Sequence, residues 1–104
     1  MPTLKLKTLT CFETDDERFD DAFLKVDGTT VWGPTRITGG QDQTIEVEVP
    51  FSTKASIELW DKDRLSKDDH LGTHNVRESE AGGGEGQARY HCGTARYRLT
   101  YEVV

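Results

Sequence analysis

The sequence predicts an all-β protein, an antiparallel Greek-key β-sandwich of seven to eight strands. Three observations predict this class. Apolar and polar residues alternate in several short segments, turn-forming residues separate these segments every eight to twelve positions, and no segment shows the apolar period of a helix. A length of 104 residues suits one domain, so we expect residues 1–104 to fold around a single thin core.

The N-terminal third is expected to supply three strands. Residues 4–12 (LKLKTLTCF) alternate at first and then change parity at Leu9 and Cys11, which predicts a β-bulge there. Residues 22–32 (AFLKVDGTTVW) indicate two strands joined by a tight turn at Asp27 and Gly28, because an Asp-Gly pair tolerates the positive φ angles of such turns.

The rest of the chain is expected to supply four further strands. Residues 43–49 (QTIEVEV), 55–60 (ASIELW) and 95–103 (ARYRLTYEV) place apolar side chains at every second position. Successive side chains of a strand point to opposite faces of a sheet, so these segments are typical of half-buried antiparallel strands. Residues 69–76 (DHLGTHNV) are expected to form another strand, and the glycine run at 82–86 (GGGEG) an exposed loop.

The net charge of −6 lies in two short segments. Residues 13–21 hold six acids and one arginine, residues 61–69 hold four acids and three bases, and acids and bases balance in the rest of the chain. A negative net charge argues against nucleic acid as a partner, because nucleic-acid binding depends on basic residues. A charge confined to two segments is also unlike a general solubilising surface, so these segments are the candidates for a specific function.

Membrane spans and a disulfide scaffold are not expected. No apolar segment is long enough to cross a bilayer, and no apolar leader follows Met1. We therefore expect a soluble, monomeric chain, either cytoplasmic or a module of a secreted protein. Two cysteines, Cys11 and Cys92, are too few for a disulfide scaffold and leave a single bridge or two free thiols as alternatives.

Catalytic chemistry has little support in the sequence. No Gly-x-Ser-x-Gly motif is present, and Cys92 has no spaced base and orienting partner for nucleophilic catalysis. His70 and His74 are four residues apart, which on a strand separates them by about 13 Å, too far for one zinc ion. We therefore expect a protein that is not an enzyme.

The acidic segments are instead expected to bind a divalent cation. Crowded carboxylates repel one another unless a positive charge neutralises them, although acidic turns that only solvate a loop remain the alternative. Oxygen ligands select a hard cation, and Ca²⁺ accepts more of them than Mg²⁺, which retains several waters. A helix–loop–helix calcium motif counted from Asp61 fails, because Ser66 stands at its glycine position and Gly72 at its final glutamate position.

A different calcium-binding pattern is present at residues 58–72. This segment (ELWDKDRLSKDDHLG), with aspartates spaced Asp-x-Asp-x5-Asp, resembles the third calcium-binding loop of C2 domains, the β-sandwich family of protein kinase C and the synaptotagmins. The other acidic loop of the family has two aspartates six apart, the second of which opens a strand. Asp15 and Asp21 are six apart here, and DAFLKV follows at 21–26 where the family has Asp-Pro-Tyr-x-Lys-Val. The resemblance covers residues 13–76 and implies a short C2-like member.

The resemblance implies a site for about two Ca²⁺ ions shared by both loops. The implied carboxylate ligands are Asp15, Asp21, Asp61, Asp63 and Asp69. Backbone carbonyls near Thr14, Lys62 and Lys67, together with the Ser66 hydroxyl, are expected to complete the coordination shells. The remaining acids of the two loops, Asp16, Glu17, Asp20 and Asp68, are expected to deepen the negative potential without binding an ion.

The loop tips suggest a membrane or protein partner. In the family, calcium bridges such loops to anionic lipid while apolar tips enter the membrane. Phe19 and Leu65 are the corresponding apolar candidates, and Arg18 and Arg64 flank them. We therefore expect calcium-dependent docking to an anionic membrane or to a partner. The alternative is a structural or interaction module of a larger or secreted protein, which calcium stabilises without lipid binding.

Overall fold

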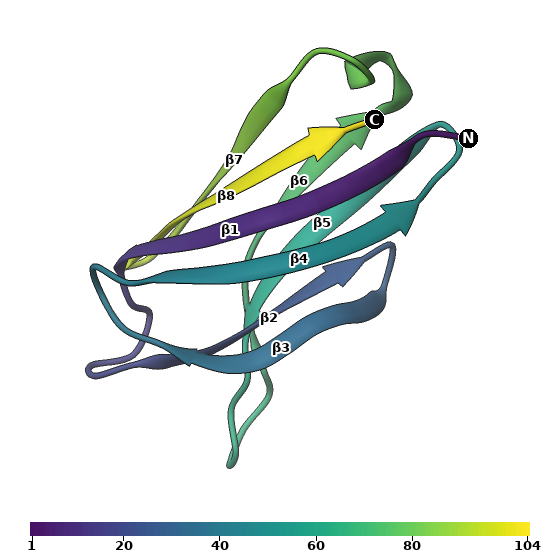
Figure 1. The fold of residues 1–104 in the computed structure, drawn as a ribbon. Helices are drawn as coiled ribbons and strands as arrows, with labels where there is room; N and C mark the ends of the chain where they lie inside the picture. Colours follow the sequence, from purple (N-terminus) through teal and green to yellow (C-terminus); the bar gives the residue numbers. More distant parts are fainter.

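The computed structural model describes all 104 residues and shows a sandwich of two four-stranded antiparallel sheets (Figure 1). Sheet A has the strand order β4-β1-β8-β7, and sheet B has the order β3-β2-β5-β6. The predicted all-β class and strand number are confirmed. The strands are β1 (Thr3–Glu13), β2 (Asp20–Val26), β3 (Thr29–Ile37), β4 (Asp42–Pro50), β5 (Lys54–Asp61), β6 (Asp69–Arg77), β7 (Glu85–Cys92) and β8 (Ala95–Val103), and the 3₁₀ turn η1 (Glu78–Glu80) precedes β7.

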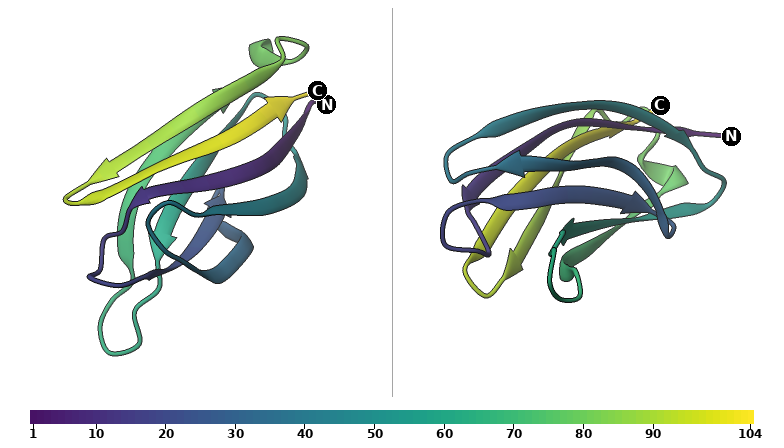
Figure 2. Two further views of the ribbon diagram at one scale, coloured as in Figure 1. Left: turned by 60° about the vertical axis from the view of Figure 1, so that its left-hand side comes forward. Right: turned by 90° about the horizontal axis from the view of Figure 1, so that it is seen from below.

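Strands that are distant in sequence pair at the centre of each sheet. In sheet A, β1 lies between β4 and β8, and in sheet B, β2 pairs with β5. Three hairpins, β2–β3, β5–β6 and β7–β8, stay within one sheet, and the other connections cross between the sheets. The β1–β2 and β5–β6 loops therefore meet at one pole of the sandwich, away from both termini (Figures 1 and 2).

The core lies between the sheets and follows the predicted alternation. Side chains on β8 alternate strictly, with Ala95, Tyr97 and Leu99 beginning a buried row that continues to the end of the strand. Twenty-two buried residues form one continuous cluster. Burial of this cluster is the main favourable contribution to folding, because apolar area removed from water contributes about 25 cal/mol per Å².

Two local predictions can be compared directly with the backbone. The turn between β2 and β3 has positive φ at Asp27 (50°) and Gly28 (85°), as predicted for this pair. β1 has irregularities between Leu6 and Thr8, where the register to both β4 and β8 shifts, and between Cys11 and Glu13, where the register to β8 shifts. They fall on either side of the predicted position at Leu9 and Cys11. Relative to β8 the extra residue is Lys7, and it restores an inward direction for Leu9, which is fully buried.

The structure also describes the glycine run and the two cysteines. The glycine run is only partly a loop, because β7 begins at Glu85 and Gly86 lies against the Tyr101 ring. Both cysteines are free, with Cys11 buried and Cys92 exposed. None of the elements is a helix with the length and apolar character that a membrane span requires.

Replacing Gly72 by alanine is expected to destabilise the fold by about 1–3 kcal/mol. A Cβ at Gly72 would lie 2.8 Å from a ring carbon of Tyr90, whose buried hydroxyl donates a hydrogen bond to the Ile57 carbonyl (3.1 Å). The ring is therefore anchored and cannot move aside cheaply. Urea denaturation of the purified variant measures the loss.

The matched control is Gly82→Ala. Gly82 also has a positive φ (79°), but an added Cβ would meet no atom within 4 Å. Gly82→Ala is expected to lose about 1 kcal/mol of stability, from the strain of an alanine at positive φ alone. Equal losses in the two variants would contradict the proposed clash at Tyr90.

Candidate metal centre

At one pole of the sandwich, three strands of sheet B carry a carboxylate at the end of the inward-facing row. The strand β5 ends at this pole, and β2 and β6 begin there. On β5 the buried row Ala55, Ile57 and Leu59 continues to Asp61, which is 1% exposed. On β2 the buried row begins with Asp20, which is fully buried. On β6, Asp69 pairs with Asp61 in the antiparallel register. The two-residue period of the strands therefore directs acidic side chains toward the pole of the core.

Four carboxylates converge at this pole. Asp15 and Asp16 come from the first acidic loop (residues 14–19, between β1 and β2), and Asp61 and Asp69 flank the second acidic loop (residues 62–68, between β5 and β6). One oxygen atom from each side chain lies within 4.8 Å of the others. Oxygen atoms this close can share one cation of the size of Ca²⁺, whose ligand distances are about 2.3–2.6 Å.

Asp61 is the most constrained member of this cluster. Its Oδ1 accepts a hydrogen bond from the backbone N–H of Asp21 (2.9 Å), whereas its buried Oδ2 has no hydrogen-bond partner. Burial, reinforced by the neighbouring Asp16 carboxylate, raises the pKa of Asp61 to about 8. A buried acceptor without a donor is costly, so Oδ2 is an oxygen atom that a cation would satisfy.

Asp15 is perturbed in the same direction. Its pKa is raised to about 6 by burial first and then by the adjacent Asp69 carboxylate, with smaller contributions from Asp20 and Asp16. The two loops therefore raise each other's carboxyl pKa values across the cluster. Such mutual repulsion favours either protons or a bound cation between them.

Asp20 holds the first acidic loop in place. Its carboxylate accepts hydrogen bonds from the backbone N–H groups of Asp15 and Asp16 (both 2.9 Å) and from the buried hydroxyl of Tyr97. The Thr94 hydroxyl, in the β7–β8 turn, donates to the carbonyl of Thr14 (2.8 Å). Because these contacts fix the backbone next to two cluster residues, Asp20 orients the site without being one of its four members.

Replacing Asp20 by asparagine is expected to destabilise the protein by about 2 kcal/mol and to weaken any cation binding at the cluster. One amide group would present an N–H toward backbone N–H donors that now meet an oxygen atom. Tyr97→Phe removes only the hydroxyl and should lose a smaller part of the stability. Urea denaturation with and without Ca²⁺ measures both effects, and an unchanged Asp20→Asn variant would contradict this role.

The second acidic loop is organised in a similar way. Asp68 Oδ1 accepts the backbone N–H of Asp63 (3.0 Å), and its other oxygen atom lies 3.9 Å from the Lys62 ammonium. The backbone N–H of Lys62 donates to the carbonyl of Asp21 (2.9 Å). Together with the Asp21–Asp61 hydrogen bond, this contact ties the two loops to each other at their bases.

The structure brings together some of the expected ligands and not others. Asp15, Asp61 and Asp69 belong to the cluster, whereas Asp21 and Asp63 do not. Asp21 follows the inward-facing Asp20, so its side chain starts from the opposite face of β2, and its contacts to Asp61 and Lys62 are through the backbone. Of the remaining expected ligands, Thr14 of the first acidic loop is half-buried, and Lys62, Ser66 and Lys67 of the second are exposed.

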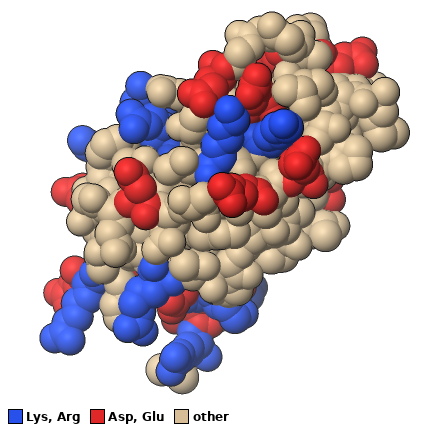
Figure 3. All heavy atoms as spheres, in the orientation of Figure 1, with Lys and Arg blue, Asp and Glu red and all other residues tan.

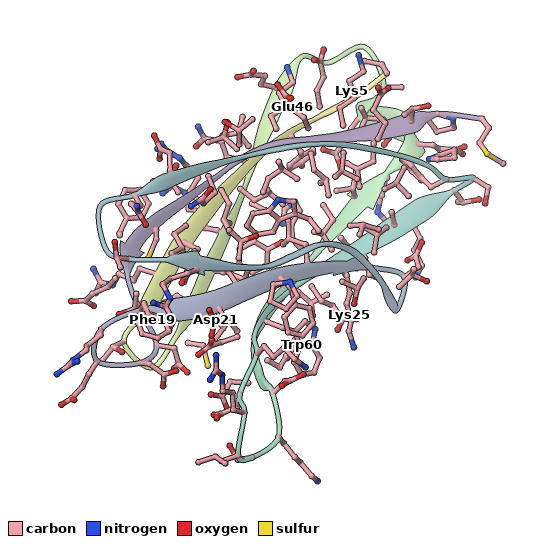
Figure 4. The ribbon with its side chains drawn as sticks, turned by 60° about the horizontal axis from the view of Figure 1, so that its bottom comes forward. Lys5, Phe19, Asp21, Lys25, Glu46 and Trp60 are labelled. Atoms are coloured by element: carbon pink, nitrogen blue, oxygen red, sulfur yellow. The ribbon has the colours of Figure 1, made fainter.

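The expected membrane-contact residues differ in their surroundings. Leu65 is 98% exposed at the tip of the second acidic loop, where Arg64 is also exposed. Phe19 is half-buried, because the Arg36 guanidinium of β3 lies 3.7 Å from its ring centroid, and Arg18 beside it is exposed (Figure 4). Leu65 is therefore the apolar side chain that projects from this pole, and Phe19 packs against the sandwich.

Sequence reasoning missed the roles of Asp16 and Asp20. Asp16 was expected to lie outside the ligand set, but its carboxylate is one of the four in the cluster. Asp20 was expected to contribute only charge, but it is buried and accepts three hydrogen bonds. Strand parity would have indicated Asp20, because it is two residues before Ala22 and four before Leu24 on the buried face. The six-residue spacing to Asp21 indicated Asp15 and left out Asp16, whereas the structure places both in the cluster.

Comparisons with known proteins support the fold alone. No protein-family model matches the sequence, and no curated protein matches it. Among solved structures, the chain is similar to human GIVD cytosolic phospholipase A2 in complex with methyl gamma-linolenyl fluorophosphonate, with a TM-score of 0.50 and 11% sequence identity. The match covers 98% of this chain and 16% of the phospholipase chain. The fold and the cluster thus define a β-sandwich with a candidate metal site at one pole.

Proposed function

We propose that this chain is a C2-like, non-enzymatic calcium-binding module. The observation that carries the proposal is the convergence of two carboxylates of the first acidic loop with the two that flank the second. One of the four, Asp61, has a buried oxygen atom with no hydrogen-bond donor. The oxygen-only donor set favours a hard cation, and its loop origin favours the flexible coordination of Ca²⁺ over the strict octahedron of Mg²⁺. The C2-like spacing of the aspartates and the sandwich fold support the same assignment.

Asp15, Asp16, Asp61 and Asp69 would hold one calcium ion in this proposal. The ion would supply positive charge that offsets the repulsion between them and a partner for the Asp61 Oδ2 atom. A second ion, which the C2 resemblance implies, would need Asp21 or Asp63, whose carboxylates lie outside the cluster. The ion count is therefore a sharper test of the C2 likeness than calcium binding itself.

We propose calcium-dependent docking of this pole to an anionic membrane. Basic side chains gather around the same pole as the acidic cluster (Figure 3), and the exposed Leu65 is carried on the second acidic loop between them. Neutralising the cluster would leave these basic groups to dominate the local potential and attract anionic lipid. An apolar tip beside basic residues also suits insertion at a membrane interface.

Calcium addition is expected to raise the stability of the protein by about 2.7 kcal/mol at a hundredfold excess over Kd. Thermal melts and isothermal titration calorimetry with Ca²⁺, with Mg²⁺ and with chelator measure this, and Mg²⁺ should give the smaller response. The calorimetric stoichiometry gives the ion count. No response to Ca²⁺ would remove the proposed function.

Membrane docking needs its own experiment. Co-sedimentation with phosphatidylserine vesicles should require Ca²⁺ and should weaken in Leu65→Gln, whose side chain lies outside the cluster. The matched control is Val104→Gln, which changes an exposed apolar residue at the pole opposite the second acidic loop. Calcium stabilisation without vesicle binding would instead favour the alternative function, a structural or interaction module stabilised by calcium.

A further inference from the structure

The outer face of sheet A carries a cluster of basic residues that the calcium proposal does not use. Arg96 and Arg98 lie on β8 and Arg89 and His91 on β7, all on the face that points away from the core. Arg89 is directly opposite Arg98 in the register of the two strands, and His91 is opposite Arg96. We call these four residues, together with Phe12 of β1, the arginine face.

The arginines of this face have no acidic partner within the chain. The salt bridges of the protein involve Lys7 and Lys62 and none of the three arginines. The register partner of Arg96 on β1 is Glu13, which also forms no salt bridge. Like charges placed directly opposite each other across strands are destabilising. A basic cluster without a salt bridge on a chain of net charge −6 therefore indicates an anionic partner.

The face is also hollowed and partly apolar. A hollow of about 480 Å³ is lined by Phe12, Arg89, Tyr90, His91, Arg96 and Tyr97. Phe12 is 50% exposed, and the Arg98 guanidinium lies 5.5 Å from its ring centroid. The buried Nε atom of Arg98 has no hydrogen-bond acceptor. Arginine and aromatic side chains are the residues enriched at protein–protein interfaces.

We propose that the arginine face is a docking surface for an acidic, extended segment of a partner protein. Arg96 and Arg98 are two residues apart on a strand, which separates their Cα atoms by about 7 Å. Alternate carboxylates of an extended peptide have the same spacing, so each could meet one guanidinium. A guanidinium binds a carboxylate through two parallel hydrogen bonds, which a lysine cannot reproduce.

The geometry favours a peptide over a lipid surface. The basic residues lie on the regular strands β7 and β8 and line a hollow on the side of the sandwich, whereas a bilayer contacts projecting loop tips. A rigid strand holds its side chains at fixed spacings, which suits a discrete ligand more than a diffuse layer of headgroups. The arginine face shares no residue with the acidic cluster, so binding to it is expected not to require calcium.

The test is fluorescence polarisation of a labelled eight-residue peptide in which glutamate and threonine alternate, measured in chelator. We expect Arg89→Gln with Arg96→Gln to weaken binding at least tenfold, and Arg89→Lys with Arg96→Lys to weaken it several-fold. The matched control is Lys54→Gln with Arg77→Gln, because these two basic residues are exposed and directly opposite each other on β5 and β6. This control removes the same charge and should leave binding unchanged.

Every other outcome overturns the proposal. Equal loss in the control and the arginine variant would mean that net charge, and no defined surface, attracts the peptide. Binding of phosphatidylserine vesicles in chelator through Arg89 and Arg96, without peptide binding, would assign the face to lipid. No binding of the peptide at millimolar concentration would remove the docking surface. None of these results depends on whether calcium binds the acidic cluster.

Discussion

Asp61→Asn is expected to change stability in opposite directions with and without calcium. In the calcium-free protein at pH 9, the variant should be more stable than the wild type by on the order of 2 kcal/mol, because it removes a buried negative charge next to three other carboxylates. In saturating calcium the wild type should be the more stable protein. Both signs follow from the same buried position of Asp61.

The loss of calcium affinity expected in Asp61→Asn has a defined size. Loss of a charged ligand at the centre of the cluster should weaken calcium binding at least a hundredfold, which corresponds to about 2.8 kcal/mol. At a concentration that stabilises the wild type by about 2.7 kcal/mol, the variant should then gain less than about 0.5 kcal/mol. Urea denaturation at fixed Ca²⁺, and again in chelator, measures the four values required.

Two further variants distinguish the observed cluster from the ligand set that the C2 resemblance implies. Asp16→Asn alters a cluster member that the resemblance leaves out, and Asp63→Asn alters an implied ligand outside the cluster. We expect Asp16→Asn to weaken the first calcium-binding event more than Asp63→Asn does. The reverse order would mean that calcium rearranges the loops toward the implied set. Glu17→Gln, an exposed acid of the same loop, is the neutral control.

The calcium-free protein is expected to lose stability as the pH rises from about 4 to about 8. The pKa of Asp61 is raised to about 8 and that of Asp15 to about 6, both from an ordinary value of 3.8. A carboxyl group with a raised pKa in the folded state stabilises the fold most while it is protonated. This contribution is therefore complete below pH 4 and disappears as the pH passes through the folded-state values.

The wild type is expected to lose on the order of 3 kcal/mol of unfolding free energy relative to Asp61→Asn between pH 4 and pH 9. This difference cancels the contributions of acids that lie away from the cluster. Calcium should abolish the decline, and its affinity should increase from pH 6 to pH 9 because protons compete for the same oxygen atoms. Denaturation at a series of pH values tests this, and a wild-type stability that rises in parallel with that of the variant would contradict it.

The sequence alone determined the fold class and the location of the acidic residues. Strict alternation in residues 95–103 and 55–60 predicted strands whose burial the structure confirms, because a strand has a two-residue period and one face must leave water. The same period, extended one step beyond Leu59, indicates that Asp61 faces inward. The aspartate spacing selected the two loops that meet at one pole.

Only the tertiary structure decided which carboxylates meet. Asp15 and Asp69 are far apart in sequence, and their approach depends on the pairing of β2 with β5 and of β5 with β6. The buried Asp20 accepts a hydrogen bond from Tyr97, 77 residues later, across the two sheets. Such contacts are properties of strand order and register, which local alternation does not encode, because many sheet topologies bury the same alternating faces equally well.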